Sequence, residues 1–174
     1  PDTMRLRAQE AAKTIGKERI SLLFFLLQEN RMPDTGQPSD DDEIGLLLHH
    51  VYENSIFEIL YHIGEPSYKL LFNFAFQGDH RLPYKAIEVL CRMAADDIHT
   101  NKTVKAIDHS IDYQSHQELL PILHALSLIR THKRVNAIFG RITERYLKNC
   151  DQHPKNLRRA VSIIRRWAYS DGQA

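Results

Sequence analysis

The sequence predicts an all-α solenoid of stacked antiparallel helical hairpins with a 35-residue repeat. Glycine and proline are scarce, seven of each in 174 residues, and apolar residues follow helical spacing over long stretches. From residue 65 onward the same apolar pattern returns at a fixed offset. Because one hairpin cannot bury its apolar stripe alone, the repeated hairpins are expected to stack on one another.

We expect one helical-repeat domain over residues 1–174, a length typical of a single domain. Residues 1–64 are expected to form degenerate N-terminal helices with an acidic loop, and residues 65–174 three hairpins. A first helix is predicted from Thr3 to near Ile15, with a break at Gly16. A second helix over 17–30 places four leucines at core spacing, namely Leu22, Leu23, Leu26 and Leu27.

The segment after the second helix is predicted to be a loop, because Pro33, Gly36 and Pro38 disfavour a helix there. The run 39–43, Ser-Asp-Asp-Asp-Glu, is interpreted as a capped helix start whose carboxylates suit the positive end of the helix dipole. A cation site is the alternative interpretation. The chain is expected to be helical over 43–63, and a break near Asn54 and Ser55 is left open.

Six apolar positions persist through three units at the 35-residue offset. They are Phe72, Ile107, Ile142; Phe76, Ile111, Tyr146; Ile87, Ile122, Leu157; Leu90, Ala125, Ala160; Met93, Leu128, Ile163; and Ala94, Ile129, Ile164. Within a unit they follow the spacing of three and four residues that places side chains on one helical face. Pro83 suits the first turn of the second helix, where its missing N–H removes no hydrogen bond.

The repeat also resembles the pentatricopeptide repeat. Residues 67–79 resemble the first helix and turn of that family, 86–93 its second helix, and 97–101 its closing turn, with Thr100 where the family often has proline. In the second unit Tyr113 replaces the turn glycine and Pro121 occupies a usual alanine position. The third unit keeps the apolar frame. The resemblance extends from Glu65 to the C-terminus.

This resemblance implies binding of single-stranded organellar RNA, in which each repeat reads one base through two side chains. The positions that match the main reader are Lys69, Val104 and Phe139, and those that match the second reader are His99 and Arg134. Valine has no hydrogen-bonding group, and stacking on phenylalanine does not distinguish bases. Base-specific recognition of RNA is therefore not expected.

Basic residues collect late in the chain, although the net charge of +1 gives the whole molecule no strong field. The candidates for partner binding are Arg141, Arg145, Arg158 and Arg165. An exposed helical face, or a docking surface for an acidic protein partner, is the favoured interpretation. A face that binds RNA phosphates is the alternative.

No catalytic, cofactor or metal site is expected. The sequence lacks HExxH, a glycine-rich phosphate loop and GxSxG. His109 and Asp112 could share a helical face, but two ligands do not complete a zinc site. The cysteines, Cys91 and Cys150, form no CxxC pair, and Cys91 is expected to be a buried thiol.

The expected function is that of a non-catalytic accessory subunit that binds protein subunits of a mitochondrial complex. Short proteins of the resembled family that have lost their base readers are fixed subunits of such assemblies, and the F1 head of ATP synthase is the best candidate partner. The alternative is an organellar RNA-binding protein with weak sequence preference. The resemblance also implies the mitochondrial matrix as the location. No apolar run approaches the roughly 20 residues of a membrane span.

Three properties are left open by the sequence, which are the partner's identity, the contact face and the stoichiometry. The chain begins at Pro1 rather than at a methionine, and whether Pro1 is a processed terminus is open as well.

Overall fold

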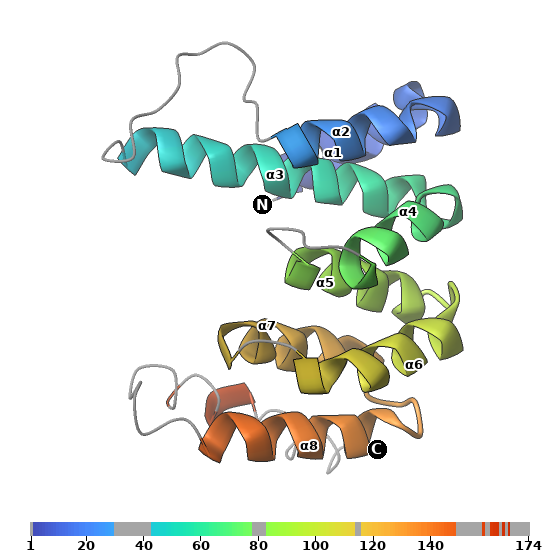
Figure 1. The fold of residues 1–174 in the computed structure, drawn as a ribbon. Helices are drawn as coiled ribbons and strands as arrows, with labels where there is room; N and C mark the ends of the chain where they lie inside the picture. The colour runs from blue at the N-terminus through green and yellow to red at the C-terminus, as the bar shows by residue number, and fades with distance from the viewer. Residues whose placement is uncertain are drawn as a thin grey trace. The chain divides into compact units, whose positions relative to one another are not determined.

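The computed structural model describes residues 2–29, 43–77, 83–113 and 116–148, together with residues 158, 161–163, 165 and 167. Every regular element in these ranges is a helix, so the predicted all-α class is confirmed (Figure 1). None of the helices in these ranges combines the length and apolarity needed to cross a membrane. The chain divides into two compact units, Pro1–Arg81 and Leu82–Ala174.

The first unit contains α1 (Asp2–Ile15), a 3-10 turn η1 (Lys17–Arg19), α2 (Ile20–Glu29), α3 (Glu43–Ile63) and α4 (Glu65–Phe76). The first two helices were predicted close to these bounds. Gly16 separates them with a φ of +66°, a left-handed conformation that glycine adopts without a steric penalty. Helix α3 packs against α1, α2 and α4.

Helix α3 runs without interruption, so the break left open near Asn54 and Ser55 does not occur. The hydroxyl of Ser55 donates to the carbonyl oxygen of Val51 at 2.7 Å, which satisfies this polar group within the helix. The chain then turns at Gly64, whose φ is +75°, and α4 follows with Pro66 in its first turn. The bounds of α3 agree with the helix expected over 43–63.

Aromatic rings form the centre of the first unit. Phe74 of α4 lies 5.8 Å from Phe24 of α2 and 6.1 Å from Phe57 of α3, measured between ring centroids. The prediction that Leu22 belongs to the core is wrong, because its side chain is 55% exposed. Helix α2 begins at Ile20, after the 3-10 turn, and buries Ile20, Leu23 and Phe24 at spacings of three and four, which turns Leu22 outward.

The second unit contains α5 (Pro83–Ala95), α6 (Thr100–Ser110), η2 (Ile111–Tyr113), α7 (His116–Leu126), η3 (Ser127–Ile129) and α8 (Val135–Lys148). Helix α5 packs against α6 and α7, and α7 packs against α8. Helices α4, α6 and α8 begin at Glu65, Thr100 and Val135, which are 35 residues apart as the repeat predicts. The boundary between the two units falls inside the first predicted hairpin, and the solenoid over a single domain stays a prediction.

The predicted core of the second unit is largely confirmed. Ile87, Leu90, Met93, Ile107, Ile122, Ala125 and Ile142 are all fully buried. Leu128 is an exception among the residues whose burial is described, since its side chain is 45% exposed. Helix α7 ends at Leu126 and the chain continues as a 3-10 helix, which advances by 3.0 rather than 3.6 residues per turn. This tighter winding keeps Ile129 in the core and turns Leu128 toward solvent.

The turn before α6 has two residues in the left-handed region, Asp97 at φ 63° and His99 at φ 51°. Thr100 is the first residue of α6, and its hydroxyl donates to the carbonyl oxygen of Ala94 at 2.8 Å. A first helical position also suits proline, because its N–H has no intrahelical partner to lose. The predicted loop at 32–38, the acidic residues 39–42, Cys150, and residues 78–82 lie outside the described residues.

Candidate functional site

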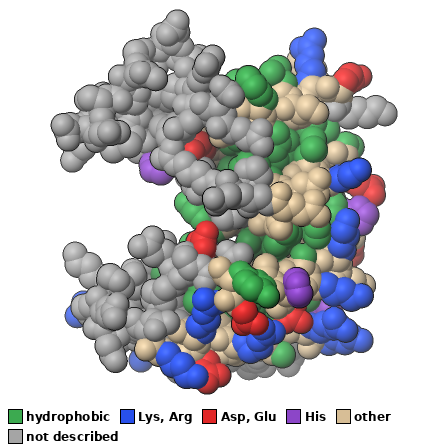
Figure 2. Space-filling view, viewed as in Figure 1, with side chains coloured by type: hydrophobic (Ala, Val, Ile, Leu, Met, Phe, Trp, Pro, Cys, Tyr) green, Lys and Arg blue, Asp and Glu red, His purple; other side chains and the backbone are tan. Residues whose placement is uncertain are grey.

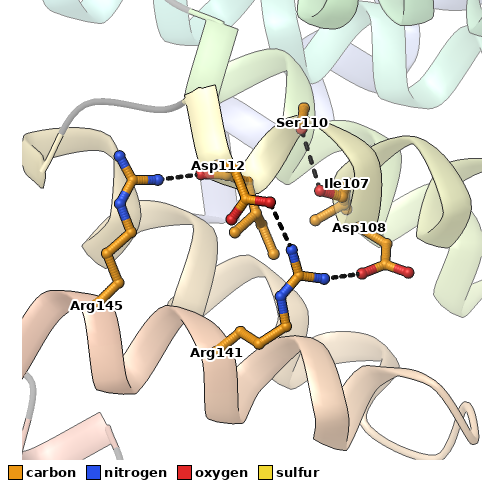
Figure 3. Close-up of polar contacts among 7 residues, drawn as sticks. Ile107, Asp108, Ser110, Asp112, Arg141 and Arg145 are labelled. Atoms are coloured by element: carbon orange, nitrogen blue, oxygen red, sulfur yellow. Dashed lines mark hydrogen bonds and ion pairs between the residues drawn. The ribbon is translucent and has the colours of Figure 1, made fainter.

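Arg141 of α8 joins its helix to α6 and the turn that follows it. One guanidinium nitrogen lies 2.6 Å from Oδ1 of Asp108, and the other lies 2.9 Å from Oδ2 of Asp112 (Figure 3). Asp108 and Asp112 are four residues apart, so their carboxylates project from neighbouring turns. The bridge is half in solvent, with 46% of the Arg141 side chain exposed. Arg141 is therefore a structural cross-link whose charge is already matched by two carboxylates.

Arg145 makes a second link one helical turn later. Its guanidinium donates a hydrogen bond to the backbone carbonyl of Ile111, where α6 has ended and its last carbonyls lack intrahelical partners (Figure 3). A basic side chain is a common partner for such carbonyls. Two of the four predicted partner-binding arginines, Arg141 and Arg145, thus hold α8 against the C-terminal end of α6.

Arg158 and Arg165 lie in described helical positions and are exposed. The structure places Arg141 and Arg145 together at the C-terminal end of α6. A role in partner binding stays a prediction for all four.

Two of the three positions that match the main base reader have buried side chains. Val104 is completely buried. Phe139 is also buried and stacks on Trp167, with ring centroids 3.8 Å apart and 23° between the planes. The indole N–H of Trp167 donates to Oδ1 of Asn136 at 3.1 Å, which fixes the indole on α8. A nucleotide base cannot reach either side chain in this arrangement.

The remaining reader positions, Lys69, His99 and Arg134, are exposed. Arg134 belongs to the turn before α8, and His132 holds this turn. The backbone N–H of Arg134 donates to Nδ1 of His132 at 3.3 Å, while Nε2 of His132 lies 3.1 Å from Oδ1 of Asn101. An accepting Nδ1 requires that Nε2 carry the proton, so the neutral imidazole joins the turn to the start of α6.

An open concave site of about 440 Å³ lies beside the Arg141 bridge. One wall is formed by α6 and η2, which contribute Lys105, Asp108, His109, Asp112 and Tyr113. Arg134 and Arg141 form the opposite wall. Tyr113 stands at the rim with 83% of its surface exposed, and its ring centroid lies 6.4 Å from that of His109. We call this feature the α6–α8 groove.

The charges in and around the groove are mixed. Figure 2 shows Lys and Arg side chains interspersed with Asp and Glu on the surface of the second unit. The groove itself combines three cationic side chains with two carboxylates. Such a surface is better suited to the alternating charges of a protein than to the uniform negative charge of a nucleic acid.

The described part of the chain contains no group of three or more His, Cys, Asp or Glu side chains that could hold a metal ion. Asp112, which could have shared a ligand pair with His109, binds Arg141 instead. Cys91 is completely buried in α5, as predicted. Burial raises the pKa of the Cys91 thiol, and the charge of Glu88 raises it further, so the nucleophilic thiolate is disfavoured.

Comparisons with known proteins add no family assignment, since a scan against family models, a search of curated proteins and a search of solved structures each return no match. The described elements define an all-α protein whose second unit carries an open groove of mixed charge.

Proposed function

We propose that this chain is a non-catalytic accessory subunit that binds a protein partner in a mitochondrial complex. The observation that carries the proposal is the burial of two of the three main reader positions. Val104 is buried and Phe139 lies against Trp167, so neither of these two side chains can reach a base of RNA. A stack of helices that has lost its readers still offers a rigid surface for another protein.

The F1 head of the mitochondrial ATP synthase is the partner we favour. The chain resembles the small extra subunit of the euglenozoan mitochondrial F1-ATPase in its length, its few helical hairpins and its non-reading repeats. By this resemblance the chain would attach to the outside of the catalytic head, in the mitochondrial matrix, and would itself perform no catalysis. The groove between α6 and α8 supports a docking role, because Arg and Tyr side chains are enriched in protein interfaces.

The second candidate is an organellar RNA-binding protein with weak sequence preference. The exposed Arg158 and Arg165 favour it, since basic side chains can bind phosphates without reading bases. Against it, Asp108 and Asp112 place carboxylates beside the exposed Arg134. Neighbouring carboxylates repel a phosphate backbone, which makes the groove a poor path for RNA.

The test is the native mass of the endogenous protein from gently lysed mitochondria, measured with and without ribonuclease. We expect a large complex that survives ribonuclease and contains F1 subunits by mass spectrometry. Collapse to the free 20.2 kDa chain after ribonuclease would establish the RNA-binding alternative. A ribonuclease-resistant complex without F1 subunits would support the accessory role but would show that the partner is a protein other than F1.

The two functions also predict different effects of charge reversal. Replacing Arg158 and Arg165 by glutamate should abolish RNA binding if the chain binds RNA through these residues. For an accessory subunit, the same variant should leave the complex intact unless this face contacts the partner.

A further inference from the structure

The α6–α8 groove contains two cationic side chains that no described carboxylate neutralises. The guanidinium of Arg141 is bound by Asp108 and Asp112. By contrast, no ion pair joins Lys105 or Arg134 to a carboxylate among the described residues, and both side chains are exposed. The groove therefore has one wall that contains the Arg141 bridge, and the exposed cations of Lys105 and Arg134 lie beside it and can bind a ligand.

The position of these cations is well defined. Lys105 projects from α6 one turn before His109, and Arg134 lies in the turn that His132 ties to Asn101 of α6. His132 and the Arg141 bridge connect the segment 132–141 to α6, so the two walls of the groove are already linked before any ligand binds. Preorganised groups lose less conformational entropy on binding than mobile ones.

The rim of the groove provides a second type of contact. Tyr113 is the most exposed large apolar side chain among the described residues and lies directly beside the charged groups. Tyrosine and arginine, like tryptophan, are enriched among the residues that dominate the binding energy of protein interfaces. An acidic segment with an apolar side chain would match Lys105 and Arg134 through its carboxylates and Tyr113 through its apolar surface.

We propose that the α6–α8 groove is the docking site for an acidic segment of the partner protein, with Lys105 and Arg134 pairing with its carboxylates and Tyr113 packing on its apolar surface. This inference rests on the proposed accessory function, for which it names the contact face. The carboxylates of Asp108 and Asp112 favour a peptide over RNA, since the discrete charges of a peptide can avoid them and a continuous phosphate chain cannot.

The test uses the full chain and three fluorescein-labelled probes at low ionic strength, where surface charges are least screened. The probes are a short Glu/Ala peptide, its Gln/Ala analogue and a short oligouridylate. The test variant is Lys105→Glu with Arg134→Glu. The matched control is Arg7→Glu with Lys13→Glu, which changes the net charge equally at two exposed basic residues of the first unit. Circular dichroism checks that both variants keep their helix content.

We expect the Glu/Ala peptide to bind at least tenfold more tightly than the Gln/Ala peptide. The test variant should lose at least tenfold in affinity for the acidic peptide, and the control less than twofold. Tyr113→Ala, which leaves the charge unchanged, should weaken binding about threefold. Equal losses in the test and control variants, or a loss in neither, would overturn the docking site. Tighter binding of oligouridylate through the same two side chains would overturn the protein assignment.

Binding to intact F1-ATPase separates this inference from the function on which it rests. If the parent chain binds F1 and the test variant binds it equally well, the groove is not the docking site and the accessory function stands. If the parent chain does not bind F1 but the peptide results hold, the choice of F1 fails and the groove keeps its specificity for acidic segments.

Discussion

The phenyl ring of Phe139 lies against the indole of Trp167, with ring centroids 3.8 Å apart and planes inclined by 23°. Trp167 is also fixed by a hydrogen bond from its N–H to Asn136. A stack and a hydrogen bond thus attach a late part of the chain to α8. The same contact removes Phe139 from the reader role that its position in the repeat implies.

Phe139→Ala tests this contact directly, because Trp167 is the only tryptophan of the chain and its fluorescence reports its own surroundings. We expect a red shift of the emission, since the indole gains contact with water. The free energy of unfolding in urea should fall by about 3–5 kcal/mol, the usual loss for a buried aromatic side chain. Lys133→Ala, an exposed change in the preceding turn, should alter neither quantity. An unshifted emission would mean that Trp167 does not depend on Phe139.

The Phe139–Trp167 stack is a contact that the sequence alone did not predict. Helix positions followed from apolar periodicity and from turn residues such as Gly16 and Gly64. Leu22 follows the 3-10 helix η1 and Leu128 lies within the 3-10 helix η3, and a 3-10 helix changes the direction in which side chains point. No local sequence pattern predicts a 3-10 turn in place of an α-helical turn, because both accept the same residue types.

The site was harder to predict than the fold. Arg141 and Arg145 were singled out by charge alone, but their partners Asp108, Asp112 and Ile111 lie on a different helix. Such pairings depend on how helices pack, and the 35-residue period relates equivalent positions rather than contacting ones. The groove was missed for the same reason, since its walls come from segments far apart in the sequence.

The bridge made by Arg141 should contribute little to stability. All three of its members are at least one-third exposed, and exposed ion pairs are typically worth about 0.2–1 kcal/mol. We expect Arg141→Met to lower the free energy of unfolding by about 1 kcal/mol at low salt and by less at high salt. Lys148→Met, which removes the exposed pair with Glu144, is the control and should cost less than Arg141→Met. A double-mutant cycle with Asp108→Asn isolates the Arg141–Asp108 pair, and an unfavourable coupling between the two side chains would contradict the bridge.

Replacement by alanine should have opposite effects on stability at Gly64 and at Gly140. A Cβ at either Gly64 or Gly140 meets nothing within 4 Å, so only the backbone decides. Gly64 has a φ of +75°, and Gly64→Ala should therefore destabilise by about 1–2 kcal/mol. Gly140 lies inside α8, where alanine is favoured, and Gly140→Ala should stabilise by about 0.5–1 kcal/mol. Thermal unfolding of both variants checks the signs, and equal signs would refute the assigned backbone conformations.

Leu90 tests the predicted core of the repeat. It is completely buried in α5, and Leu90→Ala should lower the free energy of unfolding by about 2–5 kcal/mol. Glu88→Ala changes an exposed residue of the same helix and should lie within about 0.5 kcal/mol of the parent. Urea unfolding followed by circular dichroism measures both. A Leu90→Ala variant as stable as the parent would show that this position is not in the core.

The buried thiol of Cys91 should make the free energy of unfolding depend on pH in the alkaline range. In the unfolded chain its thiol ionises near pH 8.5, whereas burial and the charge of Glu88 raise its pKa in the folded chain. Above about pH 8.5 the unfolded state therefore releases a proton that the folded state retains. The free energy of unfolding falls with rising pH in this window, by at most about 1.4 kcal/mol per pH unit for one group.

The measurement is urea unfolding between pH 7 and pH 10, with Cys150→Ser as the background so that only Cys91 contributes a thiol. We expect Cys91→Ala in this background to remove part of the alkaline slope, although it also changes stability at neutral pH. Iodoacetamide should alkylate Cys91 only after unfolding, because the thiolate is the reactive species and the folded chain disfavours it. Rapid alkylation of the folded chain, with the slope unchanged by Cys91→Ala, would place the thiol in solvent and contradict its burial in α5.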